Sequence, residues 1–235
     1  MEVDAIMIRF TRQLPTLDSG VYRLADVARY TELHANRVRS WFKQPQADNK
    51  APLFYGDYGI IEHQTAVSFL DMIDVLVAGQ FRNEGVSLGV VRKAYASLQK
   101  RLACDHPFCH QDLYTDGRTI FVLVASEIGD KTLSEIVTRQ QFFMQIKDQL
   151  MRIDYGKATR IAEKWRIVDG VVIDPRICTG KPVVESTGIT TFVISNCYFA
   201  NQEDAAIVSE LFNISESHVL SAVNFEQVYG RTRAA

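Results

Sequence analysis

The stretch that decides the fold is YRLADVARYTELHANRVRSWFK, from Tyr22 to Lys43. Its apolar residues recur three and four positions apart, which predicts two short helices joined by a tight turn. The residues expected on the two inner faces are Leu24, Val27 and Ala28, then Val38, Trp41 and Phe42. Positive charges and short hydrogen-bonding side chains, with no acid, share the outward side of the second helix. These residues are His34, Asn36, Arg37, Arg39, Ser40 and Lys43.

This outward side has the composition of a helix that enters a DNA major groove. Arg and Lys side chains contact phosphates and guanine edges, and Asn pairs with adenine. We therefore expect these six residues to bind DNA. The alternative is an ordinary helical hairpin whose basic face is only solvated.

The same stretch resembles the helix-turn-helix of MerR-like winged-helix regulators. It departs from them at Thr31-Glu32, where such turns often contain glycine, and a left-handed residue other than glycine costs roughly 1 kcal/mol. The residues that carry the resemblance are Tyr22, Leu24, Val27, Ala28, Leu33, Val38, Arg39 and Trp41.

The composition limits the classes of protein to which this chain can belong. The chain has 235 residues and a net charge of −2, so DNA binding would depend on a local patch rather than on an overall basic balance. No apolar run reaches the ~18 residues that a membrane span needs. The first ten residues lack a signal-peptide pattern, and the four cysteines are sparse. We expect a cytoplasmic protein with reduced thiols and no membrane contact.

Residues 44–62 are expected to form a small two-stranded wing. The strands would be Leu53-Phe54-Tyr55 and Gly59-Ile60-Ile61, with a turn near Gly56-Asp57. Lys50 is the best candidate on this wing for a phosphate contact, although a plain surface hairpin explains the segment equally well.

Two amphipathic helices are expected after the wing. The first covers residues 65–83, and the second is capped by Ser87 and ends near residue 102. Helix pair, wing, helix, Gly-containing turn and helix follow one another as in MerR-like domains. We therefore expect residues 1–102 to form a winged helix-turn-helix domain.

The loop 103–110 concentrates four residues that can bind zinc: Cys104, His106, Cys109 and His110. A structural zinc site commonly takes two ligands from each of two separated limbs. Four ligands from one short loop interrupted by Pro107 would close a tetrahedron with difficulty. We therefore assign no metal here and expect no cofactor, with the four side chains partly buried in a loop between domains.

Residues 103–168 are expected to link two domains. Asp116-Gly117 between β-forming residues predicts a hairpin over residues 111–125. A helix from about Thr132 to Met151 either pairs two protomers, as in MerR-like regulators, or packs inside its own chain. The basic and aromatic residues that follow favour a pair of strands across Asp169-Gly170 over a nucleic-acid site.

Residues 169–235 begin with turns and β-formers and are expected to end in two helices, Gln202–Phe212 and Ser215–Tyr229, with Ser215 as an N-cap. The segment resembles a small domain of unknown function that is common in bacterial toxin–antitoxin operons. Ser186 stands where glycine is usual in that domain. The matching residues are Asp174, Pro175, Ile177, Gly180, Pro182 and Val183, followed by Thr187, Gly188, Ile189, Thr190 and Thr191.

The sequence as a whole predicts an α+β protein, mainly α with small β-hairpins. The combination of the two units resembles VapB-like antitoxins, which implies a homodimer that binds operator DNA and represses its own operon. The resemblance also implies binding to a PIN-like ribonuclease toxin, for which Tyr229, Arg231 and Arg233 are candidate contacts. Gly180-Lys181 lacks the rest of a phosphate-binding loop, and no catalytic motif is present, so we expect no enzyme activity.

Two alternatives remain open. One is a stand-alone MerR-like transcription regulator whose C-terminal part senses a ligand or forms a dimer. The other is an adaptor whose two helical pairs serve only protein contacts.

Overall fold

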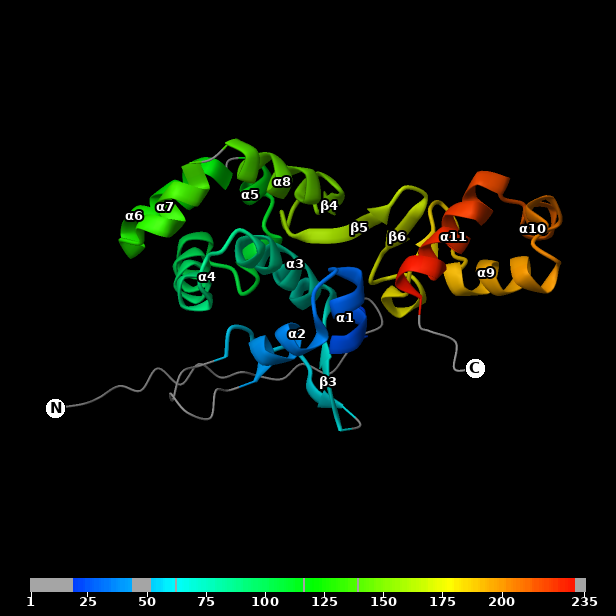
Figure 1. The fold of residues 1–235 in the computed structure, drawn as a ribbon, viewed down its shortest axis with the longest axis horizontal. Coiled ribbons are helices and arrows are strands. Elements are labelled where there is room, and N and C mark those ends of the chain that lie inside the picture. Colours follow the sequence, from blue (N-terminus) through cyan, green and yellow to red (C-terminus); the bar gives the residue numbers. More distant parts are fainter. Residues whose placement is uncertain (1–18, 44–51, 62, 116, 139, 231–235) are drawn as a thin grey trace.

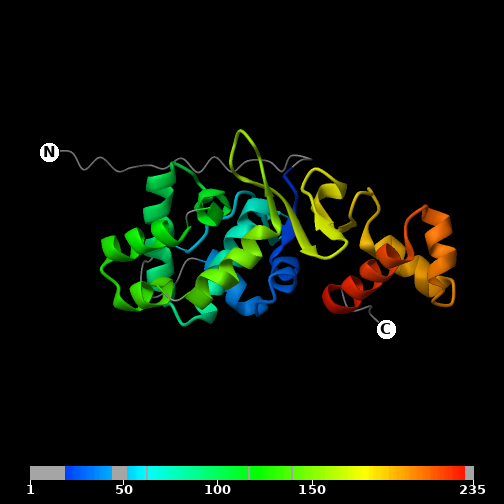
Figure 2. The same cartoon turned by 90° about the horizontal axis from the view of Figure 1, so that it is seen from above.

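A computed structural model describes residues 19–43, 52–61, 63–115, 117–138 and 140–230. Helices predominate, and two small antiparallel sheets accompany them, so the α+β prediction is confirmed. Figures 1 and 2 show an elongated arrangement in which α6 and α7 lie at one end and α10 at the other. No helix within the described ranges is long and apolar enough to cross a membrane.

The N-terminal unit contains the predicted helix pair. A three-stranded sheet in the order β1-β3-β2 lies beside it, and both of its strand pairs are antiparallel. The elements are β1 (Tyr22–Arg23), α1 (Leu24–Tyr30), α2 (Ala35–Phe42), β2 (Gly59–Ile61), β3 (Gln64–Val67), α3 (Phe69–Asn83) and α4 (Leu88–Leu102).

The hairpin lies later in the chain than the predicted wing. Leu53-Phe54-Tyr55 is not a strand: Leu53 and Phe54 are buried in the core, and Tyr55 is exposed. The hairpin instead joins β2 to β3, which the sequence assigned to the start of a helix. That helix, α3, begins only at Phe69, because Ser68 and Asp71 form a capping box that fixes its first turn.

Helix α3 is the centre of the main core. It is buried on nearly every side, and Phe81 packs edge-on to Phe121 at a ring-centroid distance of 4.9 Å. Phe81 also stacks on Phe108 at 6.0 Å. Helix α4 follows the predicted Ser87 cap, whose hydroxyl accepts a hydrogen bond from the Val90 amide.

The hairpin predicted over residues 111–125 is wrong, because this segment is helical. Phe121, Val124 and Ala125 are buried at the helical spacing, while Val122 and Leu123 are exposed. A strand would place Phe121 and Leu123 on one face, so the packing decides against the local β preference. The elements here are η1 (Pro107–Cys109), α5 (Asp112–Thr115) and α6 (Gly117–Ile128).

The helix expected from Thr132 to Met151 is described as two helices, α7 (Lys131–Thr138) and α8 (Gln140–Met151). Their buried side chains belong to the main core of the same chain, which supports the intramolecular alternative for this segment. The buried residues are Leu133, Ile136 and Val137 on α7, and Ile146 and Leu150 on α8.

A four-stranded antiparallel sheet joins the middle of the chain to its C-terminal part. Its order is β4-β5-β6-β7, and the predicted strand pair across Asp169-Gly170 is confirmed as β5 and β6. The sheet therefore crosses the domain boundary expected at residues 168–169. The strands are β4 (Ile153–Tyr155), β5 (Ala162–Val168), β6 (Val171–Ile173) and β7 (Val183–Val184), with η2 (Cys178–Gly180) between the last two.

Three helices form the C-terminal end of the described chain: α9 (Thr191–Ala200), α10 (Ala205–Phe212) and α11 (Glu216–Tyr229). The last two correspond to the predicted pair, and Ser215 caps α11 as expected by accepting from the His218 amide. Helix α9 was not predicted. A small separate core holds the three helices against β7 and consists of Val184, Ile194, Val208, Val219, Ala222 and Val223.

Candidate nucleic-acid interface

The turn between α1 and α2 forms without glycine. Glu32 adopts the left-handed conformation at φ 56°, which costs roughly 1 kcal/mol for such a residue. Local hydrogen bonds offset this cost, because the Thr31 hydroxyl donates to the Val27 carbonyl at 2.7 Å and the Leu33 amide donates to the Ala28 carbonyl at 2.9 Å. The turn geometry that the sequence left in doubt is therefore compatible with Thr31-Glu32.

Helix α2 is anchored by its inner face. Val38 and Trp41 are 0% and 1% exposed, and the Trp41 ring packs edge-on to Phe54 at 6.2 Å. His34 caps the first turn, since its Nδ1 accepts a hydrogen bond from the Asn36 amide at 3.2 Å. These contacts fix the direction in which the outer side chains of α2 point.

The outer face of α2 is exposed to solvent. Arg37 donates to the side-chain oxygen of Asn83 at 3.2 Å, and Arg39 donates to that of Asn36 at 3.2 Å. Within the described ranges, neither guanidinium pairs with a carboxylate, so both keep their charge available for a phosphate. The six predicted residues on this face are all exposed: His34, Asn36, Arg37, Arg39, Ser40 and Lys43.

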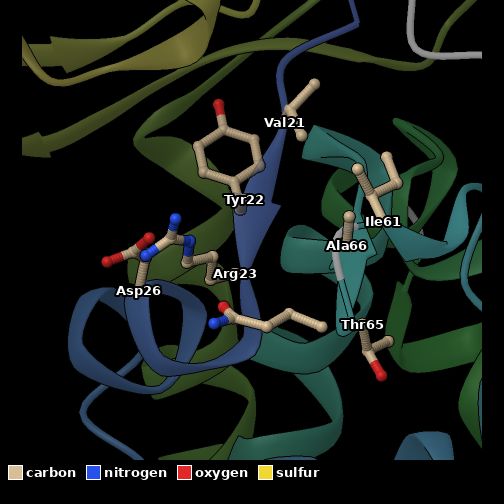
Figure 3. Close-up of a pocket in the computed structure, with 8 residues that line it drawn as sticks. Val21, Tyr22, Arg23, Asp26, Ile61, Thr65 and Ala66 are labelled. Atoms are coloured by element: carbon tan, nitrogen blue, oxygen red, sulfur yellow. The ribbon is translucent and has the colours of Figure 1, made fainter.

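The hairpin beside the helix pair contributes little positive charge. A pocket of about 280 Å³ lies between β1 and the hairpin, and Figure 3 shows Arg23 and Asp26 on one side of it, opposite Ile61, Thr65 and Ala66. Among the described residues of its lining, Arg23 is the only cation. Lys50, the predicted wing contact, lies outside the described residues.

The C-terminal motif is built around Asp174. Its carboxylate accepts hydrogen bonds from the amide and the guanidinium of Arg176, at 3.0 and 2.9 Å to Oδ1 and 2.8 Å to Oδ2. Burial alone raises the pKa of Asp174. The hydrogen bonds from Arg176 lower this pKa by more than burial raises it, so the net shift is downward. Asp174 and Arg176 together therefore fix the turn that leads into η2.

The C-terminal helices contact the predicted DNA-reading pair. The Tyr30 and Phe225 rings lie 6.1 Å apart, and the Tyr229 hydroxyl donates to Glu32 at 2.5 Å. A pocket of about 400 Å³ opens at this junction, lined by Tyr30, Phe225 and Tyr229 among others. Tyr229, a predicted toxin contact, is thus tied to its own chain, while Arg231 and Arg233 lie outside the described residues.

Large apolar side chains are exposed on the C-terminal helices. On α10, Ile207 and Leu211 are 43% and 63% exposed, and their spacing of four residues places them on one face of the helix. Exposed apolar side chains that share one face of a helix are candidates for a protein–protein contact. The full set is Phe192, Val193, Phe199, Ile207, Leu211, Leu220 and Val228.

A largely buried polar cluster, here called the His106 cluster, consists of Asp57, Asp71, Asp74, His106 and Cys109. His106 Nδ1 lies 2.7 Å from Asp74 Oδ2, and His106 Nε2 lies 3.2 Å from Asp57 Oδ1. Burial alone lowers the pKa of His106, but the hydrogen bonds to Asp57 and Asp74 raise it well above its usual value. Burial and the charge of Asp57 raise the pKa of Asp71 to about 6.

Sequence reasoning did not find the three acids of this cluster. It considered only the loop residues, of which His106 and Cys109 are in the cluster, while His110 interacts with Asp112 instead. The available signal was the composition of α3, whose apolar residues occur on all sides and leave no solvated face for Asp71 and Asp74.

Comparisons with known proteins bear on this geometry. Residues 171–225 match the model of a family described as "Protein of unknown function (DUF433)". This match covers the Gly180 turn, the exposed apolar helices and most of α11, and it agrees with the resemblance carried by the C-terminal motif.

A relative from Mycobacterium tuberculosis strain H37Rv carries the name "Putative antitoxin VapB45". It is 25% identical over 193 residues, which cover 73% of this chain and 80% of the relative. The crystal structure of Rv2018 from Mycobacterium tuberculosis superposes with a TM-score of 0.70 at 21% identity, covering 86% of this chain and 96% of the other. The present chain therefore shares its fold with that protein and is similar in sequence to an antitoxin-like protein.

Proposed function

We propose that this protein is the antitoxin of a toxin–antitoxin pair, which represses its own operon and silences a partner toxin. The observation that carries the DNA-binding part is the exposed outer face of α2, where Arg37 and Arg39 are not neutralised by acids of the described chain. Similarity to a relative named as an antitoxin supports the partner-binding part. The protein acts by binding and not by catalysis.

The DNA contact follows from the chemistry of the outer face. The two guanidinium groups can bind phosphates or guanine edges in a major groove, and Asn36 can pair with adenine. A homodimer would present two copies of α2 to half-sites about 34 Å apart. Rigid packing of Val38 and Trp41 would keep the angle of each copy fixed.

The test of DNA binding uses the duplex immediately upstream of the protein's own gene. Arg37→Ala with Arg39→Ala should weaken binding by tenfold or more and reduce the salt dependence by about two counterions. The matched control is Lys131→Ala with Lys157→Ala, which removes the same charge from exposed positions outside α2. Equal loss in both double variants would refute a specific role for α2.

We further propose that the partner is a PIN-like ribonuclease. Such an enzyme presents acidic side chains, and Arg231 and Arg233 could pair with them, since arginine binds carboxylates through two parallel hydrogen bonds. The exposed apolar face of Ile207 and Leu211 would supply the remaining contact area.

The test of toxin binding is co-expression with the product of the adjacent gene, followed by a pull-down. Truncation after Gly230 removes both arginines but keeps the Tyr229–Glu32 contact, so the fold and the DNA affinity should be preserved. We expect the truncated chain to lose at least tenfold in toxin affinity. Unchanged affinity would exclude the tail, and failure of the full chain to bind any neighbouring product would favour a stand-alone regulator.

A further inference from the structure

The His106 cluster has chemistry that neither DNA binding nor toxin binding uses. Asp57 precedes β2, Asp74 lies on α3, His106 precedes η1 and Cys109 ends it. The ligand atoms of Asp74, His106 and Cys109 all lie within 4.8 Å of one another. Asp74 and Cys109 are 0% exposed, so the three groups meet inside the protein.

The cluster contains more acidic groups than basic ones. Three carboxylates surround a single imidazole, and no lysine or arginine of the described chain forms an ion pair with any of them. Burying an unpaired charge is costly, because the low-dielectric interior solvates it poorly. A divalent cation would offset more of this charge than one imidazolium proton does.

We propose that Asp74, His106 and Cys109 form a zinc-binding site. Carboxylate, imidazole and thiolate are the three donor types that Zn²⁺ takes in proteins, and ligand atoms in a tetrahedral site lie about 3.3–3.7 Å apart. Cys109 Sγ already lies 3.7 Å from Asp74 Oδ1. His106 Nδ1 contacts the other oxygen, Asp74 Oδ2, at 2.7 Å, so the imidazole and the carboxylate have to rotate before Nδ1, Sγ and one Asp74 oxygen can surround a single ion.

The groups around these ligands are placed as outer partners of a metal site. Asp57 Oδ1 lies 3.2 Å from His106 Nε2, which leaves Nδ1 free to bind the metal once its proton is released. The Tyr95 hydroxyl donates to Asp74 Oδ2 at 2.6 Å. Asp71 Oδ2 accepts from the Asp57 amide at 3.0 Å and so holds the segment that carries Asp57. A water molecule would complete the tetrahedron.

The site differs from the one that the loop sequence offers. Among the described residues, neither Cys104 nor His110 is in the group whose ligand atoms lie within 4.8 Å of one another, and His110 contacts Asp112 instead. The loop sequence offered no ligand from a separate segment of the chain. In the structure, α3 supplies that ligand, Asp74. Binding would tie the loop to α3 and to the segment before the hairpin.

The first experiment uses the wild-type chain, so that misfolding of a variant cannot obscure the result. The protein is stripped with a chelator and reloaded with Zn²⁺ or with Co²⁺ as a spectroscopic probe. We expect one metal ion per chain after dialysis, a thiolate-to-cobalt charge-transfer band and a higher melting temperature with Zn²⁺. X-ray absorption of the zinc form should show one sulfur ligand with nitrogen and oxygen ligands. No retained metal, or two sulfur ligands, would overturn the proposal.

The second experiment separates the two cysteines. Cys109→Ser should abolish the charge-transfer band, while the matched variant Cys104→Ser should retain it; the reverse result would overturn the ligand set. Asp57→Asn should keep the band but weaken Co²⁺ affinity by about 10–100-fold, as expected of an outer partner that positions His106. An unchanged affinity in Asp57→Asn would contradict that positioning role.

Discussion

At the scale of the residue, Gly180 shows how a turn glycine can also serve a distant contact. Its φ of 81° favours glycine, and a Cβ added there would lie 2.0 Å from the Tyr22 hydroxyl oxygen. The Val21 amide donates to the Thr179 carbonyl at 3.3 Å beside it. The C-terminal motif thus packs directly on the first strand of the N-terminal unit.

Gly180→Ala should destabilise the protein by about 2–4 kcal/mol, through the left-handed backbone and the clash with Tyr22. The matched control is Gly188→Ala, since Gly188 is exposed and has no other atoms within 4 Å of an added Cβ. The control should change stability by less than about 0.5 kcal/mol. Urea unfolding measures both, and similar losses at the two positions would contradict the close contact.

A substitution at Tyr22 is expected to have the opposite effect on stability. Its hydroxyl is buried and has no hydrogen-bond partner within the described ranges, and burial raises its pKa well above the usual value. Tyr22→Phe removes an unsatisfied polar group while keeping the ring, so it should stabilise the fold by about 1 kcal/mol. A thermal melt tests this, and a lower melting temperature would show that the hydroxyl has a partner.

At the scale of the element, α6 is the clearest case in which packing overrides local preference. The run Thr119–Ala125 is rich in β-forming residues, and Asp116-Gly117 resembles a hairpin turn. Yet the buried positions follow the helical period, because the segment has to cover Phe81 of α3. Its register can be tested by substitution at neighbouring positions.

Val124→Lys should unfold the protein or cost more than about 3 kcal/mol, because Val124 is 0% exposed and the charge would be buried without a partner. Leu123→Lys should change stability by less than about 1 kcal/mol, because Leu123 is 45% exposed. Circular dichroism and urea unfolding give the comparison. A larger loss for Leu123→Lys would contradict the helical register.

At the scale of the whole molecule, two units that are far apart in sequence are joined at the turn of the helix pair. Tyr229 of α11 bonds to Glu32 in that turn, and Phe225 contacts Tyr30 of α1. The four-stranded sheet joins the middle of the chain to the C-terminal part through β5 and β6. A ligand bound to the C-terminal helices would therefore lie close to the residues that set the angle of α2.

Tyr229→Phe should loosen this junction, because it removes the bond to Glu32 at a cost of about 0.5–1.5 kcal/mol. Hydrogen exchange should become faster in residues 31–34 and in the last turn of α11, and remain unchanged in α3. Tyr198→Phe on α9 is the control, since the Tyr198 hydroxyl makes no hydrogen bond to the described residues. Equal effects of the two variants would show that the Glu32 contact does not couple the units.

Local signals in the sequence determined the helix pair α1–α2, the Ser87 and Ser215 caps, the strand pair across Asp169-Gly170 and the C-terminal motif. Each depends on periodicity or on turn chemistry within a few residues, so a short stretch of the sequence is enough to recognise it. Only the tertiary structure decided that α6 is a helix and that residues 191–200 form α9, whose apolar residues occur on all sides. It also brought Asp57 and Asp74 to His106, because burial against distant segments, and not spacing along the chain, sets which side chains meet.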